Sequence, residues 1–523
     1  MSDDYRFATQ GELIKLAYDA FGVLPRKHAD RTELDETQKK TIQKQLARLA
    51  KEEGRLIPNF EETIQTLGKI LAKYFTSPLI MAAVHDTLAD LLEAYSALVR
   101  EEGTFLDKQE TLRYFISTSA LPLVIVSLNK SLLSYSLLGF GETVPKSEFW
   151  FLPTVASDGR IEWPLEKVMR WAYQICNTTQ TQFHYPGKNT ESENYQLQQN
   201  LESAAKWTRG VSLPALPVLF HNFNQSFEAM AGCGCKVPKQ LQTNILTALT
   251  VARVVSYIGR ELERIYDVHY LEELSNQFRD YASWIADDLN EFKAELVPIL
   301  QQIESPEKSF VTWQSACINY WTFFNMKIAS VGERMQRFQN EQPSQSIRKD
   351  EVESLRRKYG RFAVNIFEDV SRRQMQFTPP ERFAEMLYRG FDLKNDSSTQ
   401  LKQVEEYAVQ LADYRLDKQL RWMEHWLRAV FYYRRKEYKA SMRYFHKAFN
   451  NAKYRAGKSQ YKLVNQYVEV AAKNDDRRNF KKGVEWAQYL GIEIRWLRKD
   501  EPTEEKLDYV FFMMKIAQYD HQM

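Results

Sequence analysis

The sequence predicts an all-α protein, a multi-domain helical bundle followed by a C-terminal region of helical repeats. Only 19 of the 523 residues are glycine, and strand-like alternating runs are few. Apolar residues instead recur at spacings of three and four, which is the period of a helix. A chain of this length should hold several domains. We divide it into residues 1–145, 146–230, 231–390 and 401–523.

Residues 1–145 are predicted to form an N-terminal helical bundle. The segment 36–53 carries Ile42, Leu46 and Leu49 on one face of a helix, with charged residues elsewhere. Two separate helices with apolar faces are expected between residues 59 and 98. A bundle explains this pattern without any further function.

The stretch 111–141 is the most apolar part of the chain. Pro122, Asn129 and Lys130 interrupt it, whereas a membrane-spanning helix needs about 20 consecutive apolar residues. We therefore expect two buried helices and no membrane contact. A proline-rich segment at 142–166 follows and is predicted to join two domains.

Residues 146–230 contain a partial DNA-binding pattern. Gly210 follows one helical stretch, and Pro214 opens another with Leu216 and Leu219 three residues apart. The region 167–225 resembles a phage-repressor-type helix-turn-helix domain, with Thr178–Phe183 similar to the start of that family's second helix. The resemblance implies that side chains of the next helix read the major groove. The candidate contacts are Gln196, Gln198, Gln199, Asn200 and Lys206. The alternative is an ordinary helix pair joined by a glycine turn.

The four cysteines are too few and too scattered for a disulfide framework. Cys233 and Cys235 lie two apart in a glycine loop, but a zinc site needs four ligands. We expect two free thiols and neither a metal nor a cofactor. The N-terminus has no basic start followed by an apolar core, so no signal peptide is predicted. These features favour a cytoplasmic protein.

Residues 231–390 are expected to form long helices, including Lys239–Val268 and Leu271–Ile303. Arg264 and His269 are separated by four residues, and this spacing resembles the active-site motif of HEPN-type ribonucleases. The resemblance implies that the arginine stabilises a phosphate and that the histidine assists proton transfer. The alternative is a surface ion-pair pattern, since the neighbouring residues are mostly acidic.

The end of this region contains a further predicted helix and a linker. Thr378 is expected to cap the helix, with Pro379 at its first position and Gly390 at its end. Phe391–Gln400 is the polar linker expected before the C-terminal region.

The segment Trp422–Phe449 is predicted to form two antiparallel helices joined by a short charged turn. After the turn come an aromatic, a small, an aliphatic, an aromatic and a small residue, namely Tyr438, Ser441, Met442, Phe445 and Ala448. This order resembles a tetratricopeptide repeat, and the likeness covers about 401–518. A second copy is expected around Leu463–Leu490. A third is expected to begin with Glu493–Arg498 and to end with Leu507–Gln518. Residues 452–460 lengthen the linker between the first two copies.

Positive charge is concentrated in the same region. Residues 431–462 contain ten lysines and arginines, one acidic residue and nine aromatic residues. Basic groups interleaved with aromatic rings suit phosphates and stacked bases. The alternative is a solvated basic face whose aromatic residues are repeat core. The candidate binding residues are Arg434, Arg435, Lys436, Lys439, Arg443, Lys447, Lys453, Arg455 and Lys458.

The sequence thus favours a non-enzymatic regulatory or binding protein. Its basic C-terminal repeats would engage nucleic acid or an acidic protein, with DNA reading as a sharper variant. A ribonuclease using Arg264 and His269 and a structural assembly scaffold remain the alternatives. A protein partner is expected, and a homo-oligomer is left open. The basic tail could also dock on the acidic segment 261–304.

Overall fold

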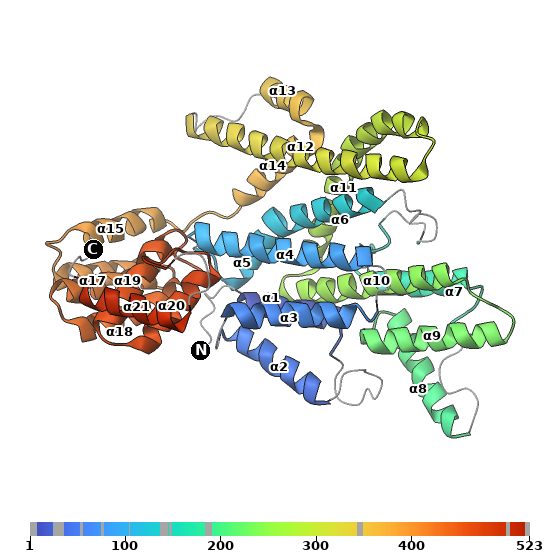
Figure 1. Cartoon of the computed structure of the whole chain (residues 1–523), viewed down its shortest axis with the longest axis horizontal. Helices are drawn as coiled ribbons and strands as arrows, with labels where there is room; N and C mark the ends of the chain where they lie inside the picture. Colours follow the sequence, from blue (N-terminus) through green and yellow to red (C-terminus); the bar gives the residue numbers. More distant parts are fainter. Residues whose placement is uncertain are drawn as a thin grey trace.

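The computed structural model describes residues 8–24, 36–52, 56–74, 78–103, 105–135, 145, 149–183, 191–341, 349–497 and 503–517. The described chain is all-α, as predicted (Figure 1). Its one small sheet is an antiparallel hairpin of β1 (Thr154–Val155) and β2 (Ile161–Glu162).

The N-terminal helices pack around a core that includes Ile14, Tyr18, Ile42 and Leu46. Leu49, the third residue of the predicted apolar face, is also buried. A capping box between Thr9 and Glu12 begins the first helix. This core also contains Leu216 and Phe220, so the N-terminal helices are not a closed unit. The helices are α1 (Gln10–Phe21), α2 (Glu36–Ala50), α3 (Leu56–Leu71) and α4 (Pro78–Glu101).

The apolar stretch forms one continuous helical path of α5 (Lys108–Phe115), a π-helical turn η1 (Ile116–Ala120) and α6 (Leu121–Tyr135). The π turn precedes Pro122, whose missing N–H disturbs regular helix hydrogen bonding. The part Lys108–Lys130 is long and apolar enough to cross a membrane by length and composition, and 28% of its apolar window is buried. It packs against α4 and against the long helices described below.

A second core joins α7 (Pro164–Ile175), α8 (Glu191–Thr208), α9 (Leu216–Gly232) and α10 (Lys239–Ile265). It crosses residue 230, where the sequence suggested a domain boundary. The buried guanidinium of Arg253 in α10 donates hydrogen bonds to the carbonyls of Pro214, Asp19 and Ala20. It thereby satisfies the carbonyls at the end of α1.

A third core lies among α11 (Val268–Gln301), α12 (Pro306–Glu341), α13 (Lys349–Tyr359) and α14 (Arg361–Gln374), with α6 packed beside it. The long helices of this region are confirmed. Asp369 is buried and accepts hydrogen bonds from Arg373, Tyr281 and Gln277. These bonds compensate the burial of its carboxylate.

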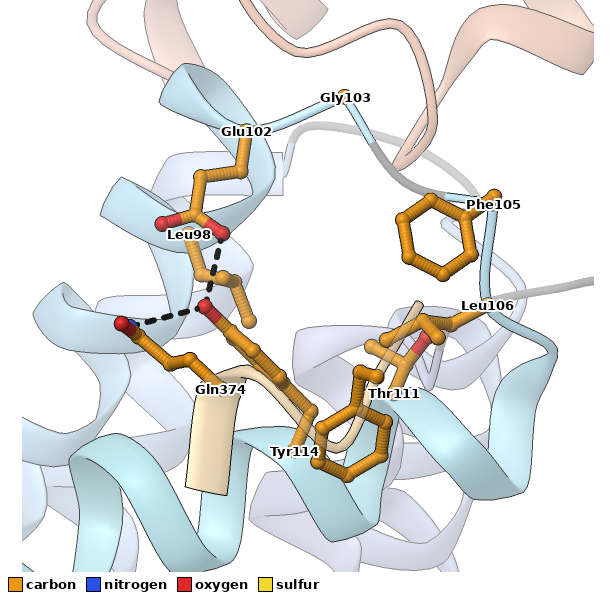
Figure 2. A pocket seen from close by; sticks show the side chains of 9 residues that line it. Leu98, Glu102, Gly103, Phe105, Leu106, Thr111, Tyr114 and Gln374 are labelled. Carbon is orange, nitrogen blue, oxygen red and sulfur yellow. Dashed lines mark hydrogen bonds between the residues drawn. The ribbon is translucent and has the colours of Figure 1, made fainter. Parts of the chain in front are cut away.

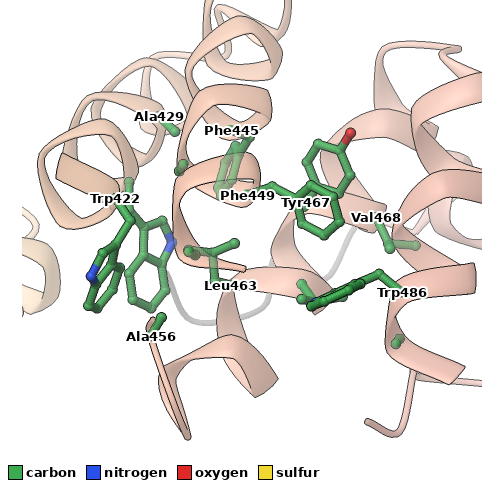
Figure 3. Packing of buried hydrophobic residues seen from close by; sticks show 14 of the residues in the cluster. Trp422, Ala429, Phe445, Phe449, Ala456, Leu463, Tyr467, Val468 and Trp486 are labelled. Carbon is green, nitrogen blue, oxygen red and sulfur yellow. The ribbon is translucent and has the colours of Figure 1, made fainter. Parts of the chain in front are cut away.

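The C-terminal helices are stacked side by side at one end of the molecule (Figure 1). The two helix pairs predicted around Trp422–Phe449 and Leu463–Leu490 are present, and their expected inner residues are buried. Figure 3 shows the aromatic packing of this core, in which Phe449 stacks on Tyr467 with ring centroids 4.3 Å apart. The helices are α15 (Phe383–Asn395), α16 (Leu401–Asp413), α17 (Arg421–Arg434), α18 (Tyr438–Ala452), α19 (Ser459–Lys473), α20 (Arg477–Tyr489) and α21 (Glu504–Ile516).

The structure differs from the predicted element ends around α15. This helix begins at Phe383 rather than beside Thr378, and it continues through Gly390 to Asn395. Gly390 is buried inside the helix, and Met423 packs closely against it. A Cβ at this position would lie 2.6 Å from Met423 Cγ. The glycine therefore permits close helix packing and does not end the helix. The first part of the expected linker is helical.

Two other expected helical segments are wrong. Ile494 and Leu497 form an isolated β-bridge in a turn, so the described part of the predicted third pair is reduced to α21. Thr178–Phe183 forms turns after α7 and opens no helix.

Candidate anion-binding interface

The predicted basic residues fall into two groups, and the first joins the C-terminal helices to the body. Lys453 Nζ lies 2.7 Å from Glu52 Oε2, and both side chains are nearly buried. The hydroxyl of Tyr454 donates to the same carboxylate. Lys453 also lies over the ring of Trp486, with its Nζ 4.1 Å from the centroid. The ammonium group of Lys453 therefore makes contacts within the protein and is not a free surface charge.

The neighbouring residues complete this contact. Ala456 pairs with Gly103 after the end of α4, and Gln460 donates a hydrogen bond to the carbonyl of Val99. Lys458 lies 4.0 Å from Glu101 at an exposed position. Residues 452–460, which lengthen the linker between the two helix pairs, thus dock on the end of α4. The basic tail pairs with Glu52 and Glu101. Among the described residues, these two ion pairs do not involve the acidic segment 261–304.

Arg455 and Arg434 also donate hydrogen bonds to backbone carbonyls within the C-terminal region. Arg455 is buried and donates to the carbonyl of Lys418 at 2.8 Å. Arg434 donates to the carbonyls of Lys394 and Asp396 at 2.7 and 2.6 Å. The Lys394 and Asp396 carbonyls lie at the end of α15, where carbonyls lack partners within the helix, and the Lys418 carbonyl lies in the turn before α17.

The second group points outward from α18. Lys439, Arg443 and Lys447 are exposed and follow one another at four-residue spacing on one face of this helix. That spacing corresponds to a rise of about 6 Å between successive charges. Lys436 precedes them in the turn, with a left-handed φ of 60°. Arg435 is exposed beside it. We call Lys436, Lys439, Arg443 and Lys447 the outer row.

Aromatic rings accompany the outer row. Tyr444 stacks on Tyr432 of α17 with centroids 5.5 Å apart and an interplanar angle of 6°. The charged groups of Arg443 and Lys447 each lie 5.5 Å from the centroid of the Tyr444 ring. Arg428 of α17 lies 5.9 Å from the same centroid. Tyr444, Tyr432 and Arg428 were missing from the predicted site. The interleaving of basic and aromatic residues in 431–462 covers the two tyrosines but not Arg428.

The charge of this face is only partly compensated. Arg428 pairs with Glu424, and Arg435 pairs with Glu437. In the described ranges, no carboxylate forms an ion pair with any member of the outer row. Burial lowers the pKa of the nearby His425; Glu424 raises it, and Lys447 is among the basic residues that lower it further.

A second positive cluster lies between α15, α17 and α19. Lys394 is buried, and its Nζ lies 4.6 Å from the centroid of the Trp426 ring. Burial lowers the pKa of Lys394 to about 7, with contributions from Lys462 and Arg434. A lysine with this pKa is about half protonated near pH 7.

The predicted DNA-reading residues lie on α8. The structure places Gln198, Gln199 and Lys206 at exposed positions and Asn200 at a half-buried one. The side chain of Gln196 lies outside the described residues. The helix-turn-helix resemblance assigns Thr178–Phe183 to the start of the second helix of that motif. These residues are not helical, so the described chain has no such helix at this position.

The proposed ribonuclease pair is split between two helices. Arg264 lies in the last turn of α10, and His269 lies in the first turn of α11, after a break at Tyr266 and Asp267. Both are exposed, and Arg264 donates to Glu261 at 2.6 Å. The structure gives this pair no buried, preorganised site.

Cys233 and Cys235 are exposed free thiols, while Cys176 and Cys317 are buried. Among the described residues, no group of three or more His, Cys, Asp or Glu side chains could hold a metal ion. Comparison with family models, curated proteins and solved structures finds no match to this chain.

Proposed function

We propose that this chain is a non-enzymatic, cytoplasmic binding protein whose outer row contacts the phosphates of a nucleic acid. The observation that carries the proposal is the line of exposed, uncompensated charges on α18 beside the stacked pair of Tyr432 and Tyr444. Phosphate contacts supply most of the sequence-independent affinity for nucleic acids, and aromatic faces add stacking with unpaired bases. Single-stranded nucleic acid is therefore the first candidate.

The helical hairpins around the outer row support a binding role. We infer that α17–α20 are tetratricopeptide-like pairs, because Ser441, Met442, Phe445 and Ala448 of the predicted order are buried. Tyr438, the first residue of that order, is half-buried and packs against the same core. Such repeats present extended surfaces on a rigid scaffold. The docking of residues 452–460 on α4 fixes this scaffold to the body of the protein.

The test is fluorescence anisotropy of labelled single- and double-stranded RNA and DNA at two salt concentrations. Lys439, Arg443 and Lys447 are replaced together by Gln, which keeps side-chain length and removes charge. The matched control replaces Arg389, Lys402 and Arg415, which are also exposed and C-terminal. The outer-row variant should lose affinity and the control should not. Binding that is unaffected by the outer-row changes would contradict the proposal.

An acidic protein partner is the alternative outcome of the same experiment. It would be indicated if no nucleic acid binds at low salt but the wild-type protein retains an acidic protein that the outer-row variant does not. The probes are also checked for cleavage, because RNA cleavage lost in His269→Ala would favour the ribonuclease alternative.

A further inference from the structure

A cavity of about 270 Å³ lies where the end of α4 meets α5 and the chain after α14 (Figure 2). Pockets for drug-sized ligands are usually about 300–1,000 Å³, so this one suits a smaller molecule. The cavity is lined by Leu98, Glu102, Gly103, Phe105, Leu106, Thr111, Tyr114, Gln374 and Phe377.

Glu102 is the one charged residue of this lining. The hydroxyl of Tyr114 donates to Glu102 Oε2 at 3.2 Å and accepts a hydrogen bond from Gln374 Nε2 at 3.1 Å. Figure 2 shows both bonds at one wall of the cavity. Gln374 thus orients the Tyr114 hydroxyl so that its proton points to the Glu102 carboxylate.

No basic group compensates Glu102 in the part of the chain that the structure describes. The glutamate follows the last residue of α4, where the helix dipole is negative. Glu102 and Gln374 are exposed residues at the rim of the cavity. Partial desolvation of the Glu102 carboxyl by neighbouring groups raises its pKa, and the Tyr114 hydroxyl opposes this effect. The potential at this wall therefore favours a cation.

The rest of the lining adds to that preference. Phe105, Tyr114 and Phe377 bring three aromatic rings to the cavity, and Tyr114 and Phe377 meet edge to face with centroids 5.3 Å apart. Aromatic faces carry partial negative charge and attract cations, and the three rings here are half-buried. Leu98 and Leu106 contribute apolar surface for alkyl groups.

We propose that this cavity binds a small organic ammonium compound, with the cation facing Glu102 and its alkyl groups facing the aromatic and leucine side chains. A metal ion would find a single carboxylate, and an anion would be repelled. The site is independent of the outer row. It adjoins the contact between Gly103 and Ala456, so its occupant would lie beside the segment that docks the C-terminal helices.

The test is isothermal titration of the full chain with choline and with 3,3-dimethylbutan-1-ol, its uncharged isostere. Choline should bind saturably, and the isostere should bind at least about tenfold more weakly because it lacks the charge. Titration with n-butylammonium, which has N–H donors that choline lacks, shows whether the cation is recognised mainly by Glu102 or mainly by the aromatic rings. Tighter binding than choline indicates N–H donation to Glu102, and weaker binding indicates recognition by the rings; either result supports the site.

Glu102→Gln should reduce choline binding to the level of the isostere. The matched control is Glu93→Gln, an exposed position on the same helix outside the cavity. Phe377→Leu, which keeps an apolar wall, should weaken choline more than the isostere. The proposal is overturned if choline gives no saturable binding up to about 10 mM, if the isostere binds equally well, or if Glu102→Gln leaves choline binding unchanged.

Discussion

Replacing Lys453 with Met should destabilise the docking of the C-terminal helices on the body. The lysine ammonium lies 2.7 Å from Glu52, and the two side chains are only 12% and 13% exposed. Met retains the apolar stem that packs beside Trp486 but removes the charge. Glu52 would then remain as a nearly buried carboxylate without its cation.

Breaking a buried ion pair by removing one partner costs about 3–5 kcal/mol. The lower end applies here, because the hydroxyl of Tyr454 still donates to Glu52 in the variant. We therefore expect a loss of about 3 kcal/mol in the free energy of unfolding. The double variant Glu52→Leu with Lys453→Met should recover part of this loss, since both charges of the pair are removed while the Tyr454 hydroxyl loses its acceptor.

Urea unfolding followed by tryptophan fluorescence measures the effect, because Trp486 lies beside the substituted residue. The control is Lys458→Met, which removes a lysine of the same segment whose side chain is 77% exposed and 4.0 Å from Glu101. An exposed pair contributes about 0–1 kcal/mol. The reasoning is refuted if both single variants lose the same stability, or if the double variant is no more stable than Lys453→Met.

Two further predictions concern Gly390 and Lys394. Gly390→Ala should cost about 1–3 kcal/mol in thermal unfolding, because the new methyl would meet Met423. Gly68→Ala, in open space within α3, should instead be neutral or stabilising by up to about 1 kcal/mol; equal effects would refute the packing argument. Lys394 has a pKa lowered from 10.5 to about 7 by burial and by Lys462. The folded state then binds fewer protons than the unfolded state between these values, so stability should rise with pH across this window. Lys394→Met should remove that rise in urea unfolding series, and an unchanged pH profile would contradict the assignment.

Local patterns in the sequence predicted the helices well where spacing alone decides burial. Trp422, Trp426 and Tyr433 lie at helical spacing, and all three are buried in α17. The charged turn after α17 was also predicted, and Lys436 adopts the left-handed φ there. These features depend on residues close to one another in the chain.

Features that depend on distant residues were not predictable in this way. Gly390 resembles a helix end in the sequence, and only the approach of Met423 shows that it permits packing. Lys453 and Arg455 look like free surface charges, because their partners, Glu52 and the carbonyl of Lys418, lie elsewhere in the chain. The cavity at Glu102 gives no sequence signal, since its lining comes from three separate segments.

The proposed function is tested most directly by the salt dependence of nucleic-acid binding. The slope of log affinity against log salt falls by about 0.7–0.9 for each phosphate that the protein no longer neutralises. The Gln variant of Lys439, Arg443 and Lys447 should therefore show a slope smaller by about 2 to 3 than the wild-type protein. Equal slopes for wild-type protein and variant, or no binding of any nucleic acid at low salt, would contradict the account.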